Sequence, residues 1–102
     1  MRIGNLDIPG PDIEAFCRKW RIRELAFFGS VLRDDFGPES DVDVLVSFDT
    51  DGQMTLDSFV TMREELSALV GGRQIDLVEK RLVRNPFRRH EILTTREIVY
   101  AA

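Results

Sequence analysis

The chain has 102 residues, enough for one compact domain with a single hydrophobic core. Hydrophobic residues make up 43% and charged residues 31%, a balance that is typical of globular proteins and excludes general disorder. The formal net charge of −4 argues against direct binding to nucleic acid or to an anionic membrane.

The compartment is indicated by cysteine usage and by the absence of targeting signals. Cys17 is the single cysteine, so no disulfide framework can form, and its apolar neighbours predict a small buried side chain. No apolar run approaches the length of a membrane span. The first twelve residues lack the apolar region of a signal peptide. We therefore expect a cytoplasmic protein with one domain over residues 1–102.

The first half of the chain predicts two helices and two strands. A helix-start signal at residues 10–12 is followed by apolar residues at helical spacing up to Trp20. The apolar run 25–28, closed by a glycine, predicts a buried strand. Residues 31–36 predict a short helix, which Gly-Pro at 37–38 would end. Residues 41–48 alternate in polarity and predict a second strand.

The second half predicts the same pair of elements twice. A turn at 49–52 precedes a predicted helix over 56–70, which a Gly-Gly pair ends. Residues 73–78 predict a third strand. Asn-Pro then caps a predicted helix that runs to about residue 93, and residues 98–100 predict a last short strand. This order predicts an α/β (α+β) domain with one small mixed sheet and flanking helices.

Asp41 and Asp43 are the first candidates for chemistry. Two residues apart on a strand, they would share a face and lie about 7 Å apart along the backbone. Two carboxylates this close repel each other unless a cation offsets the repulsion, and Mg²⁺ suits them because it also takes waters and phosphates as ligands. Taken alone, the pair is explained more simply by a strand face that is exposed to solvent.

Gly29, Ser30 and Arg33 form a candidate phosphate site where the first predicted strand turns into a helix. Backbone N–H groups at such a turn attract phosphate, Gly29 permits close approach, and Ser30 and Arg33 can donate hydrogen bonds. An ordinary turn with a capping serine explains the same residues.

Asp76 is the third candidate carboxylate. It is flanked by Ile75 and Leu77, which would lie on the other face of their strand. If that strand neighbours the one carrying Asp41 and Asp43, three carboxylates converge, as in sites where two metal ions clamp a phosphoryl group. An exposed sheet face would also explain this aspartate.

Taken together, these motifs resemble the signature of nucleotidyltransferases of the DNA polymerase beta superfamily. The segment FFGSVLRDDFGPESDVDVLV is similar to the minimal nucleotidyltransferase branch (MNT-type), with Arg33 at a position where that branch commonly has arginine. The endings QIDLVEKRLVRNPFRRHEIL and REIVYAA are similar as well. Asp34 departs from the pattern, because the branch usually has glycine there.

The resemblance implies a fold, an activity and a partner. It implies a polymerase beta-like core in which Asp41, Asp43 and Asp76 bind two Mg²⁺ ions and Gly29, Ser30 and Arg33 bind a nucleoside triphosphate. Members of this branch are only the catalytic core and pair with small helical HEPN-type toxins. As antitoxins, they can transfer AMP from ATP to a tyrosine of that toxin.

Two further classes of function stay open. The chain could neutralise its partner by binding alone, or it could be an α/β scaffold whose aspartates face water. A cationic stretch is either a solvated helix face or a patch for an acidic partner, or for RNA held by that partner; it is formed by Lys80, Arg81, Arg84, Arg88 and Arg89. The sequence also leaves base preference, acceptor and homo-oligomer formation open.

Overall fold

The computed structural model describes residues 1–49 and 55–102 and contains a mixed four-stranded sheet. The sheet order is β5-β4-β3-β6, with bounds Ile75–Glu79, Val42–Phe48, Ile22–Phe28 and Glu97–Ala101. β4 and β5 are parallel, whereas β3 is antiparallel to both β4 and β6. The predicted mixed sheet with flanking helices is confirmed.

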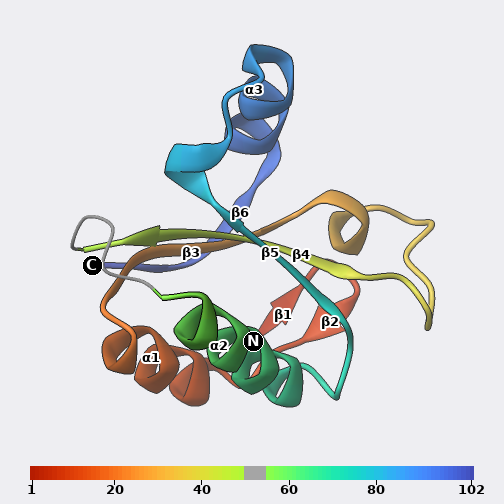
Figure 1. The fold of residues 1–102 in the computed structure, drawn as a ribbon. Coiled ribbons are helices and arrows are strands. Elements are labelled where there is room, and N and C mark those ends of the chain that lie inside the picture. The colour runs from red at the N-terminus through yellow and green to blue at the C-terminus, as the bar shows by residue number, and fades with distance from the viewer. Residues whose placement is uncertain (50–54) are drawn as a thin grey trace.

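Two helices cover one face of this sheet (Figure 1). They are α1 (Gly10–Lys19) and α2 (Leu56–Leu69), and α2 forms the crossover between the parallel strands β4 and β5. The predicted helical spacing is confirmed in α1, where Ile13, Phe16 and Cys17 are buried. Burial raises the pKa of Cys17 to about 12, which keeps the thiol protonated and inert, as expected of a core residue.

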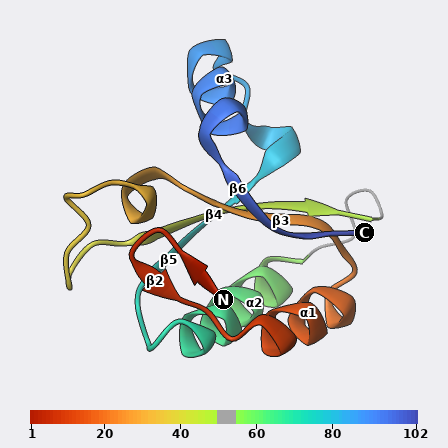
Figure 2. The same cartoon turned by 180° about the vertical axis from the view of Figure 1, so that it is seen from behind.

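The third helix, α3 (Pro86–Thr95), stands on the opposite face of the sheet (Figures 1 and 2). The predicted cap is confirmed, because the Asn85 side chain accepts hydrogen bonds from the N–H groups of Phe87 and Arg88. Val83 and Ile92 pack against Ala26 and Leu45 in a second, smaller core. The sheet is therefore covered fully on one side and only in part on the other.

A second sheet was not expected from the sequence. Strands β1 (Arg2–Ile3) and β2 (Leu6–Asp7) form an antiparallel hairpin that packs below the main sheet, on the side of α1 and α2 (Figure 2). Its turn reaches the chain after β3, since the N–H of Asn5 donates to the carbonyl of Val31 and its side chain donates to the carbonyl of Arg33 at 2.8 Å. The hairpin thus supports the loop beside the candidate site.

One predicted helix is wrong, several predicted boundaries differ from the structure, and one prediction lies outside the described residues. Residues 31–36 do not form the predicted helix; a single 3-10 turn, η1 (Gly29–Leu32), ends where Arg33 donates to the carbonyl of Ser30. β3 starts at Ile22, three residues before the prediction. The turn expected at 49–52 falls, apart from Asp49, outside the part of the chain that is described.

The early part of β3 contains Glu24, a largely buried carboxylate held by two cations. Lys80 donates to it at 3.2 Å and Arg96 at 2.8 Å, which ties β3 to the segments before and after α3. Burial alone would raise the pKa of Glu24, but hydrogen bonds from Arg96 and Lys80 outweigh burial and lower it.

We expect Glu24→Gln to destabilise the protein at pH 7 by about 1–2 kcal/mol, because it leaves two cations unpaired. A lowered carboxyl pKa stabilises the fold above the ordinary value of about 4.3, and this stabilisation is lost as the pH falls through the folded-state pKa. The difference between variant and wild type should therefore shrink below about pH 4 in urea denaturation. The control Glu14→Gln, which breaks the exposed pair with Arg18, should cost under about 0.5 kcal/mol. An equal loss at pH 3 and pH 7 would contradict an electrostatic role.

Candidate active site

The central feature of the candidate site is a pair of aspartates on neighbouring strands. In the parallel ladder between β4 and β5, Asp43 stands directly opposite Asp76. Such neighbours lie about 4.8 Å apart across the strands. Both aspartates alternate with residues of the main core, so they face the side of the sheet that carries α3. The sequence prediction that Ile75 and Leu77 face away from Asp76 is confirmed.

Asp43 is the more enclosed of the two carboxylates, and several effects act on its pKa. Burial raises the pKa of Asp43, and the negative charge of Asp76 raises it further, as does a hydrogen bond between the two side chains that requires one of them to be protonated. The N–H of Ser30 donates to the Asp43 carboxylate and opposes these effects, while the charge of Asp41 adds a small further increase. Within residues 1–49 and 55–102, Asp43 has no ion pair with a lysine, arginine or histidine.

Gly29 makes this arrangement possible. Its φ of +73° lies in the left-handed region, and a Cβ at this position would meet the Asp43 Oδ2 atom at 2.3 Å. Any other residue would therefore push the carboxylate away from the turn. The sequence interpretation of Gly29 as a close-approach residue fits this contact, but the group that approaches in the structure is a carboxylate of the same chain.

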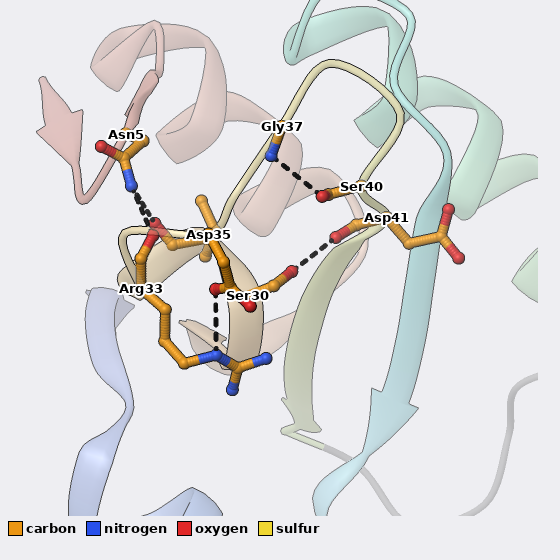
Figure 3. Close-up of polar contacts among 8 residues, drawn as sticks. Asn5, Ser30, Arg33, Asp35, Gly37, Ser40 and Asp41 are labelled. Atoms are coloured by element: carbon orange, nitrogen blue, oxygen red, sulfur yellow. Dashed lines mark hydrogen bonds and ion pairs between the residues drawn. The ribbon is translucent and has the colours of Figure 1, made fainter.

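Ser30 connects the turn to the start of β4. Its Oγ atom donates to the backbone carbonyl of Asp41 at 3.3 Å (Figure 3), while its N–H donates to Asp43. The helix dipole expected here is weak because η1 is a single 3-10 turn rather than a longer α-helix. Ser30 thus braces two of the candidate aspartates.

Asp41 lies at the site, but its side chain is turned outward. β4 begins at Val42, one residue later than predicted, so Asp41 precedes the first paired residue of the strand. In Figure 3 its carboxylate points away from Ser30 and Arg33, and the residue lines an open hollow between residues 38–41 and 71–74. Among the side chains that the structure describes, no three of His, Cys, Asp or Glu are grouped to hold a metal ion.

Arg33 extends away from Asp41. Its guanidinium pairs with Asp35 at 3.4 Å, and both side chains are more than half exposed (Figure 3). Exposed pairs of this kind contribute little to stability, so Arg33 can exchange Asp35 for another anion at small cost. Arg33 thus lies next to the turn, but its guanidinium is paired with Asp35 and not with a group of the turn.

Arg73 contributes to the site although the sequence reading did not single it out. Its guanidinium donates to the carbonyls of Gly37 at 3.0 Å and Ser40 at 3.2 Å, and it stacks on the Phe36 ring with 4.3 Å to the centroid. Ser40 closes the same loop by accepting from the N–H of Gly37 at 3.0 Å (Figure 3). Arg73 therefore fixes the backbone just before Asp41. A single arginine before a strand carries no sequence signal of this role.

The chemistry of these groups suits a divalent cation. Three carboxylates are hard oxygen ligands, the type that Mg²⁺ prefers. The Asp43–Asp76 pair, which has no cationic partner within the described part of the chain, places like charges together on a half-covered sheet face. A bound cation would remove that repulsion, and the exposed side chain of Asp41 can change its rotamer.

Comparison with known proteins places this geometry in a family. The nucleotidyltransferase domain family matches residues 13–99. The chain is 34% identical over 82 residues to protein adenylyltransferase MntA of Thermococcus cleftensis, covering 80% of this chain and 77% of that protein.

Two solved toxin–antitoxin structures share the fold. A complex with AMP-PNP matches with a TM-score of 0.71 at 15% identity, covering 93% of this chain and 75% of the other. An MntA–HepT complex matches with a TM-score of 0.62 at 15% identity, covering 91% and 70%. The residues of the candidate site, from Gly29 to Asp76, all lie within the family match. The resemblance to minimal nucleotidyltransferases is therefore confirmed, and the chain belongs to the nucleotidyltransferase domain family.

Proposed function

We propose that this chain is a Mg²⁺-dependent protein adenylyltransferase that moves AMP from ATP to a hydroxyl of a partner toxin. The observation that carries the proposal is the Asp43–Asp76 pair. The two residues are in register on parallel strands, and within the described residues no cationic side chain is paired with them. Support also comes from the relative named protein adenylyltransferase MntA and from the fold shared with toxin–antitoxin structures. We take the acceptor to be a tyrosine of a HEPN-type toxin, so that the chain acts as the antitoxin.

Each residue of the proposed site has a separate task. Asp41, Asp43 and Asp76 would hold two Mg²⁺ ions, which when bound neutralise the triphosphate and lower the pKa of the acceptor hydroxyl. The turn formed by Gly29 and Ser30 receives the triphosphate. Arg33 leaves Asp35 and donates to a phosphate oxygen, a stronger hydrogen bond than its exposed ion pair.

The transfer itself is a substitution at the α-phosphorus. The acceptor oxygen attacks in line, a new P–O bond forms, and the bond to the β-phosphate oxygen breaks so that pyrophosphate leaves. Asp76 accepts the proton of the hydroxyl, because it is the more exposed member of the pair and faces the open part of the sheet. The protein contributes mainly position and charge.

The second candidate is an antitoxin that acts by binding alone. The outward orientation of Asp41 and the lack of a ready three-carboxylate group among the described residues favour it. A measurement of pyrophosphate release distinguishes the two candidate functions, because an antitoxin that only binds would neutralise its partner without releasing pyrophosphate.

The first test is the metal dependence of ATP binding. Without metal the carboxylates repel the triphosphate, so titration calorimetry should detect ATP binding with Mg²⁺ and at least tenfold weaker binding in EDTA. Asp57→Asn removes an acid in the first turn of α2, on the other face of the sheet, and should leave the affinity unchanged. Equal affinity for ATP in EDTA would exclude the proposed site.

The second test separates nucleotide binding from chemistry. Asp43→Asn should lose affinity for Mg·ATP and transfer activity together. Asp76→Asn should keep most of the binding but lose transfer by about a hundredfold or more, because the acceptor hydroxyl is no longer activated. Without metal, Asp76→Asn should melt at or above the wild-type temperature, since it relieves repulsion with Asp43. Wild-type transfer by Asp76→Asn would remove this residue from the mechanism, and a much lower melting temperature would make it structural.

The third test concerns the backbone before Asp41. Arg73→Ala removes both hydrogen bonds to the loop and the contact with Phe36, so the backbone at Asp41 keeps the hydrogen bond from Ser30 but loses the support of the loop before it. We expect the Mg²⁺ concentration for half-maximal ATP binding to rise about tenfold, as for other residues that orient metal ligands. Arg73→Lys should restore part of this affinity, and Arg63→Ala on α2 serves as the control. If Arg73→Ala is folded and its Mg²⁺ requirement is unchanged, the contacts of Arg73 with the loop do not position Asp41.

A further inference from the structure

Helix α3 is mostly solvent-exposed. Of its ten residues only Ile92 is buried. Phe87 in its first turn is 86% exposed, and Leu82, just before the helix, is 56% exposed. In Figures 1 and 2 the helix rises from the sheet, with its far end away from every other element. Exposing large apolar side chains such as these two is unfavourable in water, which suggests that another surface covers them.

The structure divides the cationic stretch into occupied and available groups. Lys80 is paired with Glu24, and Arg89 donates to the carbonyls of Lys80 and Val83. Arg84 and Arg88 are exposed and have no ion pair within residues 1–49 and 55–102. The available positive charge therefore flanks Phe87 in the sequence. We call Leu82, Arg84, Phe87 and Arg88 the α3 patch.

The α3 patch belongs to the element beside the candidate active site. The base of α3 packs on Ala26, Leu45 and Val78 through Val83 and Ile92. Leu45 and Val78 each follow the catalytic candidates Asp43 and Asp76 by two residues, on the same face of the sheet. A macromolecule that holds α3 is therefore kept over the face from which the aspartates act.

We propose that the α3 patch is the docking surface for the acceptor protein, and that it binds an apolar pocket rimmed by Asp or Glu. This inference rests on the proposed function. Phe87 supplies the apolar anchor, and Arg84 and Arg88 form bidentate ion pairs with carboxylates at the rim, the residue types that dominate protein interfaces. RNA is the weaker candidate, because two available arginines in a chain of net charge −4 neutralise few phosphates and Leu82 cannot stack on bases.

The experiment uses the full chain and the partner protein that co-purifies with it from its own cell, identified by mass spectrometry and then purified. The dissociation constant of the pair and the KM for the partner are measured for wild type, Phe87→Ala and Arg84→Glu/Arg88→Glu. We expect at least a tenfold weaker complex and a matching rise in KM for both variants, with unchanged affinity for Mg·ATP.

Matched controls lie on the opposite face of the sheet. Leu56, which is 79% exposed on α2, and the exposed Arg63 on the same helix are changed to Ala and Glu respectively, and both variants should bind the partner like wild type. Circular dichroism and the unchanged affinity for Mg·ATP show that the α3 variants are folded.

The outcomes separate the inference from the proposed function. Wild-type partner affinity in both α3 variants overturns the docking surface, even if Asp43→Asn abolishes transfer. The α3 variants could instead weaken the partner complex while the wild-type protein shows no transfer activity. This result would support the docking surface and overturn the proposed enzymatic activity. If the α3 variants lose affinity only for a labelled 20-mer of poly(A) RNA and keep the partner, the patch is a nucleic-acid site and the inference is wrong.

Discussion

The register between β4 and β5 is the constraint on which the candidate site depends. Because the two strands are parallel and Asp43 is paired with Asp76, the carboxylates occupy the same position along the sheet and the same face. A shift by one residue would turn one of them into the main core, where a charged group without a partner is very costly. The apolar neighbours on both strands therefore hold the acids together, although the acids repel each other.

The two faces of the sheet carry different tasks. Helices α1 and α2 and the N-terminal hairpin bury one face completely and provide the larger core. The other face is covered only where α3 stands on Ala26 and Leu45. The larger core thus lies on one side of the sheet. The end of the other side, which holds the aspartates, can therefore stay open to the proposed nucleotide without exposing that core.

Features of the fold that depend on neighbouring residues could be predicted from the sequence, whereas features that depend on contacts between distant residues could not. The alternation of polar and apolar residues is a local property of a strand. The strand that carries Asp43, and the sheet face on which Asp76 lies, could therefore be predicted from the sequence. The start of β3 could not, because Glu24 looks like the polar end of a loop, and the cations that make its burial acceptable come 56 and 72 residues later in the chain. Strands of two residues, such as β1 and β2, are too short to show any periodicity. The resemblance to a family named the candidate residues but could not orient them.

Asp41 shows most clearly that residue spacing alone does not predict the orientation of a side chain. Its spacing from Asp43 predicts a shared strand face, yet the strand begins one residue too late to impose that orientation. The backbone of Asp41 is nevertheless held on both sides, by Ser30 at its own carbonyl and by Arg73 at the carbonyl of Ser40. The side chain of Asp41 is exposed, so rotation about its torsions is fast and costs little. The outward rotamer keeps a third negative charge away from two that already repel each other, and a cation bound at the pair would turn this repulsion into attraction.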